Sequence, residues 1–312
     1  MTAIKMFLLS KQGKKVILSV IFSIVILISV SCGMCSYKVT QISIQEVINY
    51  FRPTMVIKIL PKLTSNSYKE KIMYATYFEL FLSKYENDKN TRNITIQKII
   101  DSEFYFDPAS DSYTAELDDN VFFDNVESQL LIEIDDNQRQ KIVETANKID
   151  LTNNAMELAD FALSQLNNHY TSYTSYEPIN GEWDSTFISY CCEQLGYIEA
   201  GYYKKHTDRN TALSECRRTG KFQDGYAYGN EYVPFPGDII FLNRDCENST
   251  SDQMGIVTKI EGTVITMVVG DGGQNWSGSS VALRRYEYNS SYIVGYYPIS
   301  NYINKSILEE EK

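Results

Sequence analysis

The stretch PGDIIFLNRDCENSTSDQMGIVTKIEGTVITMVVGD, residues 236–271, decides the fold class of this chain. It opens with a Pro-Gly turn and a short apolar run, and it continues with two β-rich segments separated by Glu261 and Gly262. Two apolar, β-branched runs on either side of a two-residue turn are typical of a β-hairpin. The segments VALRRYEY (281–288) and YIVGYY (292–297) predict two further strands.

The residues before this stretch predict helices. In SYKEKIMYATYFELFLSKYEND (67–88), the aromatic residues from Tyr74 to Tyr85 recur at helical spacing, which predicts a core-facing stripe. Asp135 followed by Gln138 has the spacing of a capping box. We expect the acidic stretch ELDDNVFFDNVE (116–127) to be a solvated loop, because it lacks the ligand spacing and the glycine of a calcium loop. Helices followed by a run of strands predict an α+β fold with a mostly antiparallel sheet.

Composition excludes several classes of protein. The 312 residues are 43% hydrophobic, enough for a sizeable core, so the chain is not a disordered one. The 40 acidic and 29 basic residues give a net charge of -11, which excludes nucleic acid as a partner. The sequence GDGGQNWSG (270–278) resembles a phosphate loop only in its glycine content, and no metal-ligand spacing occurs. We therefore predict no cofactor and no metal.

A candidate membrane segment lies near the N-terminus. Four lysines, ending with Lys14 and Lys15, precede the nearly uncharged run VILSVIFSIVILISVSCGMC (16–35). A run of this length can cross a bilayer as a helix, and the basic flank keeps the N-terminus cytoplasmic. We favour a signal anchor. The alternative is a lipoprotein signal in which SVSC makes Cys32 the lipid-modified N-terminus. In both cases the body is exposed outside the cytoplasm, on the cell membrane.

Five short motifs carry a resemblance to a known family. They are WDSTFISYC (183–191), PGDIIF (236–241), QMGIV (253–257), MVVGD (267–271) and RRYEYNSSYIVGYYPI (284–299). In order and spacing they resemble the CHAP domains, cysteine- and histidine-dependent amidohydrolases or peptidases of peptidoglycan. The resemblance implies a papain-like fold. The phrases CEQLGYIEAG (192–201) and GKFQDGYAY (220–228) are similar to CHAP proteins of mobile elements in Gram-positive bacteria, which implies a place near a conjugation apparatus or the cell wall.

The apolar run, the helical patterns and the resemblance together divide the chain into four parts. Residues 1–37 are the cytoplasmic tail and signal anchor, or alternatively a lipoprotein signal; 38–148 are a mainly helical region, 149–300 the CHAP-like domain, and 301–312 a polar tail.

The family's catalytic positions hold the wrong residues for its chemistry. Asp184 stands where the family has its nucleophilic cysteine, Gln253 stands where it has the histidine base, and Asp271 resembles the third, orienting residue. Amide cleavage by this route needs a thiolate and an imidazole that exchanges protons near neutral pH. A glutamine amide has no such equilibrium, and losing the nucleophile or base alone costs about a million-fold in turnover. We expect no intact catalytic site, and we expect Asp184 to serve as a helix cap.

The remaining thiols and imidazoles leave alternatives open. Cys191 and Cys192 are adjacent, so a disulfide to Cys216 or Cys246 is one alternative and buried free thiols are the other. The histidines are His169, which we expect at the surface, and His206.

Two functions follow from these observations. The first is a non-catalytic domain that binds peptidoglycan peptides or a cell-envelope protein complex. The second is an active hydrolase in which another cysteine pairs with His169. Aromatic candidates for the groove are Tyr170, Tyr173, Tyr176, Trp183, Trp276 and Tyr286.

Overall fold

The structure is a computed structural model that describes residues 44, 46–64, 67–82, 88–149, 151, 155–173, 183–271 and 279–299. The described chain is α+β with antiparallel sheets, as predicted. Almost all of the described residues belong to one compact unit, Ile48–Lys312. No helix in the described ranges is both long and apolar enough to cross a membrane, and the predicted anchor at 16–35 falls outside those ranges.

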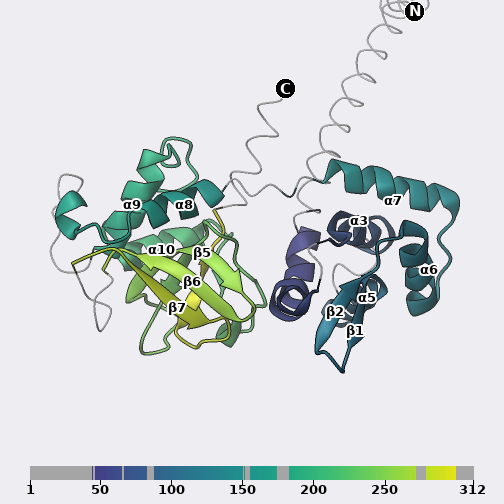
Figure 1. Ribbon diagram of the computed structural model, residues 1–312. Helices are drawn as coiled ribbons and strands as arrows, with labels where there is room; N and C mark the ends of the chain where they lie inside the picture. Colours follow the sequence, from purple (N-terminus) through teal and green to yellow (C-terminus); the bar gives the residue numbers. More distant parts are fainter. Residues whose placement is uncertain are drawn as a thin grey trace, which may run out of the picture. The chain divides into compact units, whose positions relative to one another are not determined.

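Residues 48–149 are mainly helical, as their sequence predicts (Figure 1). The predicted capping box is confirmed: the Gln138 N–H donates to Asp135 Oδ1 at 2.9 Å, and the Asp135 N–H donates to Gln138 Oε1 at 3.0 Å. The helical segments are 48–54, η1 (Met55–Ile59), η2 (Leu60–Lys62), α3 (Glu70–Leu80), α5 (Lys89–Glu103), α6 (Asp119–Leu130) and α7 (Asp136–Lys148).

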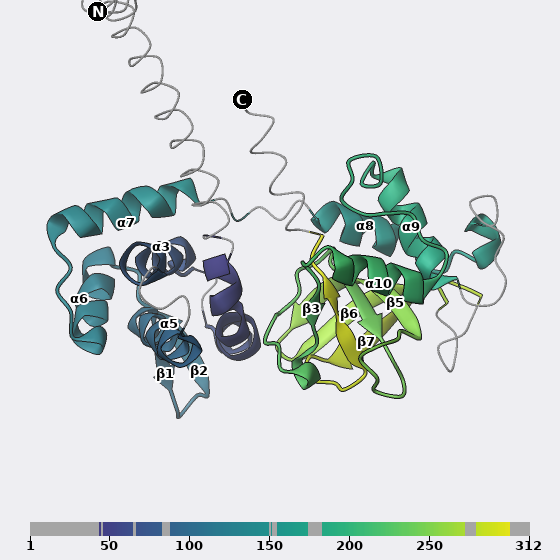
Figure 2. The ribbon, with the colours of Figure 1, turned by 180° about the vertical axis from the view of Figure 1, so that it is seen from behind.

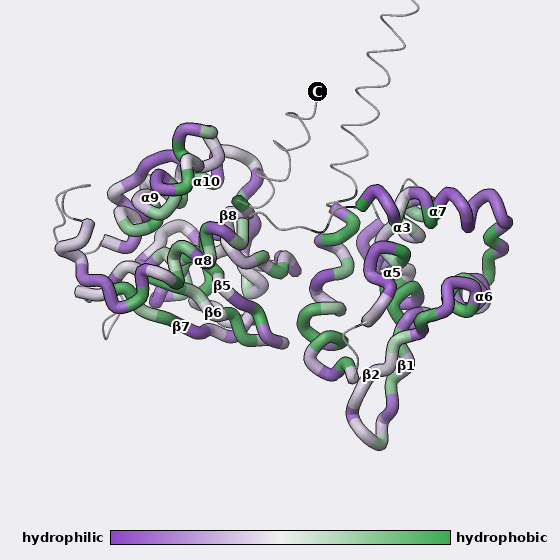
Figure 3. Tube along the Cα trace, turned by 45° about the horizontal axis from the view of Figure 1, so that its top comes forward, coloured by the Kyte–Doolittle hydropathy of each residue, from purple (hydrophilic) through white to green (hydrophobic). Residues whose placement is uncertain are grey.

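The aromatic stripe predicted over residues 74–85 is core at Tyr74, Tyr77 and Phe81, whereas Phe78 is half-buried and Tyr85 lies outside the described residues. Tyr74 and Tyr77 are buried and meet the ring of Phe51 edge-on, with centroids 5.1 and 6.1 Å away. Such edge-to-face pairs add about 0.5–1.5 kcal/mol beyond the burial of their area. By contrast, α7 is mainly hydrophilic (Figure 3), and its buried side chains are those of Ile142 and Ala146.

Two predictions for this region are wrong or incomplete. The acidic stretch expected to be a loop is helix α6 instead, because Asp118 caps it by accepting the N–H groups of Asn120 and Val121. A hairpin of β1 (Phe104–Asp107) and β2 (Ser112–Ala115) was not predicted. Asp107 makes its turn by accepting the Ala109 N–H at 2.9 Å.

The C-terminal region is built around a six-stranded antiparallel sheet, part of which is labelled in Figure 2. The order of its strands is β3-β8-β4-β5-β6-β7. The predicted hairpin is confirmed as β5 and β6, and its turn places Gly262 at a φ of 56°. The strands are β3 (Gln223–Asp224), β4 (Ile239–Leu242), β5 (Gln253–Glu261), β6 (Val264–Val269), β7 (Ala282–Glu287) and β8 (Ile293–Tyr297).

Both faces of the sheet are buried at β4, which explains why this strand is apolar throughout, whereas β7 at the edge has no buried residue. Ile239 and Phe241 belong to the core shared with the helices, whereas Ile240 and Leu242 belong to a second core on the opposite face. Helices α8 and α9 contact β5. The helical segments of this region are α8 (Met156–Ser164), η3 (Tyr170–Tyr173), α9 (Asp184–Gln194), α10 (Arg209–Arg218) and η4 (Tyr226–Tyr228).

The turn before β4 is fixed by a buried aspartate. Asp238 accepts the Tyr232 hydroxyl at 2.7 Å and the Phe235 N–H at 2.8 Å. Gly237 has a φ of 93°, and a Cβ there would lie 2.1 Å from the carbonyl oxygen of Ala155. The Pro-Gly-Asp sequence is therefore explained by packing and hydrogen bonding alone.

Candidate functional site

Asp184 joins the start of helix α9 to strand β5. Its Oδ1 accepts the N–H of Ser185 at 2.8 Å, and its Oδ2 accepts the N–H of Met254 at 2.6 Å. Asp184 is the first residue of the helix, and Trp183 occupies the cap position. The prediction that Asp184 caps α9 is therefore wrong: Trp183 occupies the cap position without a side-chain cap bond, and the Asp184 carboxylate binds the next N–H and the sheet instead.

Gln253 and Asp271 meet on the same side of the sheet. Gln253 is the first residue of β5, and its Nε2 donates to Asp271 Oδ1 at 3.2 Å and to the Asp271 carbonyl at 3.4 Å. Asp271 follows β6, the strand paired with β5. The pairing brings together two residues that are 18 positions apart in the chain.

Arg209 completes the cluster, and sequence reasoning missed it. Its Nη2 lies 3.3 Å from Asp184 Oδ1 and 3.6 Å from Asp271 Oδ2. It is the first residue of α10, whose start is fixed by Asp208 accepting the Thr211 N–H at 2.7 Å. The signal for this helix was that Asp208 cap, followed by buried residues at helical spacing, namely Arg209, Ala212, Leu213 and Cys216.

The cluster of Asp184, Arg209, Gln253 and Asp271 is closed to solvent. The side chains of Arg209, Asp184 and Asp271 are 5%, 1% and 1% exposed, and Gln253 is fully buried. Gly270 keeps the loop close to the helix, because a Cβ there would lie 2.8 Å from Phe187 Cβ and 3.0 Å from Asp184 Cα. An open cleft at these residues is therefore absent from the described structure.

Charge balance makes this cluster a proton-binding group. Two carboxylates and one guanidinium would leave a net negative charge out of water, which is costly unless a proton neutralises it. Burial and the neighbouring Asp184 carboxylate raise the pKa of Asp271 to about 8, while Arg209 opposes the shift. The cluster can hold charge and a proton, but it offers no thiolate and no imidazole.

The cysteines of the described residues are all free thiols. Cys191, Cys192 and Cys216 are buried, and burial raises the pKa of each thiol. Cys246 is exposed, and its Sγ lies 3.2 Å from Ser291 Oγ. None of the disulfides considered above is formed among them, and none of these sulfurs contacts a base that would ionise it.

The two histidines lie apart from the cluster. His169 is exposed, as expected, and its ring packs on Tyr170 with centroids 4.5 Å apart. His206 is 8% exposed. Within the described part of the chain, no cysteine sulfur is hydrogen-bonded to either ring.

The aromatic groove candidates that the structure describes do not line an open groove. Tyr173 and Trp183 are each 1% exposed and stack on each other at 5.6 Å, because both pack into the core with Phe187. Tyr170 and Tyr286 are half-buried. Tyr176 and Trp276 lie outside the described residues.

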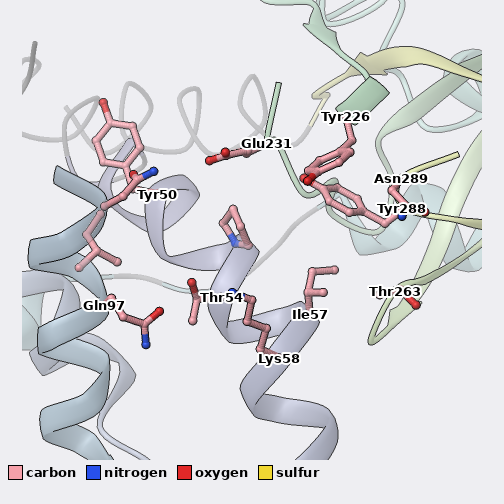
Figure 4. A pocket seen from close by; sticks show the side chains of 13 residues that line it. Tyr50, Thr54, Ile57, Lys58, Gln97, Tyr226, Glu231, Thr263, Tyr288 and Asn289 are labelled. Atoms are coloured by element: carbon pink, nitrogen blue, oxygen red, sulfur yellow. The ribbon is translucent and has the colours of Figure 1, made fainter. Parts of the chain in front are cut away.

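A pocket of about 400 Å³ is lined by residues of both regions (Figure 4). It contains none of the site residues predicted from the sequence. Tyrosines and amides are prominent in its wall, including Tyr50, Tyr226, Tyr288, Gln97 and Asn289.

Comparison with known proteins adds no relative: no protein-family model, curated protein or solved structure matches this chain. The resemblance to CHAP domains therefore depends on the motifs quoted above.

Proposed function

We propose that residues 149–300 form a CHAP-like domain of papain-like fold that has lost catalysis and acts by binding. One observation carries the proposal. The residues at the three positions that resemble the family's nucleophile, base and orienting residue, Asp184, Gln253 and Asp271, are assembled with Arg209 into a single buried cluster. The β5–β6 hairpin by itself brings Gln253 to Asp271, but Asp184 joins them from helix α9, outside that hairpin, and this meeting supports the match.

The chemistry of the cluster supports a role without catalysis. Asp184 is bound by two backbone N–H groups and faces Arg209, so its carboxylate is held as a structural anion rather than exposed as a nucleophile. Gln253 cannot move protons as the imidazole of a hydrolase does. The network holds α9, α10 and the sheet together where a working enzyme would need access for its substrate.

The place of action in this proposal is the outer face of the membrane. The apolar run at 16–35 with its basic flank supports a signal anchor, or alternatively a lipid at Cys32. The body would then bind peptidoglycan peptides or a protein of the cell envelope, such as a component of a conjugation or secretion apparatus. The net charge of -11 supports a partner other than nucleic acid.

The competing function is a hydrolase with a relocated cysteine and histidine. It needs a sulfur within hydrogen-bond reach of an imidazole in an open cleft. Three thiols are buried with raised pKa values, and the exposed Cys246 lies beside Ser291. These observations favour the binding role.

A pair of assays on the full-length chain in mild detergent tests the proposal. We expect no release of soluble muropeptides from purified peptidoglycan, together with sedimentation of the chain with insoluble wall. Muropeptide release that thiol-blocking reagents abolish would refute the non-catalytic role. Failure to sediment would exclude wall binding and leave an envelope protein as the partner.

The placement of the family positions has its own test. In Asp184→Cys combined with Gln253→His, the new imidazole would lie against Asp271 and beside the new thiol. We expect the ultraviolet absorbance of the thiolate, measured as a difference from the wild-type chain, to show a thiol pKa at least about one unit below that of Asp184→Cys alone. Equal pKa values in the two variants would show that residues 184 and 253 do not occupy partner positions.

A further inference from the structure

A second pocket lies in the C-terminal region, outside the buried cluster. Its volume is about 320 Å³, at the small end of the range for ligand pockets, and its wall includes Tyr202, Lys204, His206, Glu215, Arg218 and Tyr297. We call it the His206 pocket. None of the four residues of the buried cluster lines it.

His206 is held rigidly in this wall. Its N–H donates to Ser189 Oγ at 2.8 Å, and the Ser189 hydroxyl donates to the His206 carbonyl at 2.7 Å. The ring meets Tyr203 edge-on at 5.5 Å, and the residue is 8% exposed. Within the described residues, neither ring nitrogen makes a hydrogen bond. A largely buried imidazole with unused donor and acceptor atoms at a pocket is suited to a ligand.

The rim of the His206 pocket carries a net positive charge. Lys204 Nζ and Arg218 Nη2 lie 3.0 and 2.5 Å from the same oxygen of Glu215. Two cations share one carboxylate, and each retains N–H donors that Glu215 does not use. Burial lowers the pKa of His206, so the imidazole is neutral near pH 7 and adds no further charge.

We propose that the His206 pocket binds the free carboxylate end of a short peptide. The carboxylate is held at the rim by Lys204 and Arg218, while His206 donates a hydrogen bond and the rings of Tyr202 and Tyr297 contact the terminal side chain. A monoanion matches the single excess charge of the rim, whereas an ammonium group would be repelled. This inference deepens the proposed binding function and rests on it.

Binding of small probes to the full-length chain tests the inference by calorimetry. The probes are N-acetyl-D-alanyl-D-alanine and N-acetyl-L-alanyl-L-alanine, each as the free acid and as the C-terminal amide, and inorganic phosphate. We expect at least one free acid to bind about tenfold more tightly than its amide, which lacks the charge. The D and L arms separate wall peptides from ordinary protein C-termini.

Matched variants locate the site. Lys204 and Arg218 side chains are 69% and 70% exposed, so Lys204→Gln with Arg218→Gln should leave folding intact and weaken acid binding about tenfold or more. Lys259→Gln is the control, because Lys259 also sits in an exposed ion pair, with Glu261 at 2.5 Å, but lies on β5 away from this pocket. His206→Phe should also weaken binding, by about tenfold.

Any one of four results would overturn the inference. The first three are no binding of any free acid at about 10 mM, equal binding of acid and amide, and equal binding by the Lys204/Arg218 double variant and the control. Phosphate binding as tightly as the acids would also overturn it, because that would indicate a general anion patch. The double variant could fail to bind acids and still sediment with insoluble wall. In that case the chain binds peptidoglycan through another surface, and the proposed function stands without a role for this pocket.

Discussion

Replacing Arg209 with methionine is the sharpest test of the buried cluster. The guanidinium lies 3.3 Å from one carboxylate and 3.6 Å from another. At an effective dielectric constant of about 20, each attraction is worth about 5 kcal/mol before the cost of desolvation. Removing one member of a buried ion pair usually costs about 3–5 kcal/mol, because the remaining charge has no compensation. We expect Arg209→Met to lower the free energy of unfolding by this amount at pH 8.

Urea unfolding followed by tryptophan fluorescence measures this loss, since Trp183 stacks on Tyr173 beside the cluster. The matched control is Arg218→Met on the same helix, whose ion pair with Glu215 is exposed and should be worth less than about 1 kcal/mol. Adding Asp271→Asn to Arg209→Met should recover part of the loss, because it removes a carboxyl group that otherwise has to be buried either charged or with a proton that the unfolded chain does not hold.

Two results would refute the reasoning. One is a cost below about 1 kcal/mol at pH 8, which would place Arg209 in a solvated pair. The other is that Arg209→Met with Asp271→Asn is less stable than Arg209→Met alone. This would show that the arginine does not stabilise the fold by compensating the charge of the carboxylates.

Three further predictions follow from the same geometry. The raised pKa of Asp271 means that the folded chain keeps a proton which the unfolded chain has released, so stability should fall as pH rises from about 4 to about 8. Asp271→Asn should reduce that slope in urea unfolding. Burial also raises the pKa of Glu103, to about 7, so the wild-type slope alone cannot be assigned to Asp271 and the two chains must be compared. An unchanged slope of stability against pH in Asp271→Asn would refute the assignment to Asp271. Gly270→Ala should lower the unfolding free energy by about 1–3 kcal/mol, since its Cβ would meet a backbone Cα and a core Cβ, and a thermal midpoint within error of wild type would contradict this packing. Peptide mapping after brief native alkylation should find Cys246 modified and Cys191 protected, and the reverse order would contradict the burial of α9.

Local pattern predicted the elements whose signals are local. The strand pair β5–β6 and the capping box at Asp135 follow from alternation, turn residues and a spacing of three, all of which act within a few residues. Helix α6 was mistaken for a loop because its acidic composition hid the cap at Asp118. The β1–β2 hairpin was missed because its four-residue strands are too short to show alternation.

The site was predictable only in part. The motifs located Asp184, Gln253 and Asp271, and the structure brings these three together. Arg209 was not predictable in the same way, because its partners lie 25 and 62 positions away in the chain and a single arginine gives no periodic signal. The burial of Tyr173 and Trp183 could not be predicted from the sequence either, because aromatic residues occur both in binding grooves and in cores.

The hydrogen bond from Met254 to Asp184 restricts what position 184 can become. Met254 pairs with Phe241 of β4 on one side, but on the other side the register of β5 with β6 begins at Ile256, and there the Met254 amide has a carboxylate as its acceptor. If the side chain at position 184 is too short to accept this hydrogen bond, the Met254 N–H is left buried without an acceptor, which costs about 1–3 kcal/mol. A thiolate at this position would instead face a hydrogen-bond donor that is already oriented toward it. The groups that now stabilise the Asp184 carboxylate, the Met254 N–H and Arg209, are therefore the same ones that would stabilise a reactive sulfur.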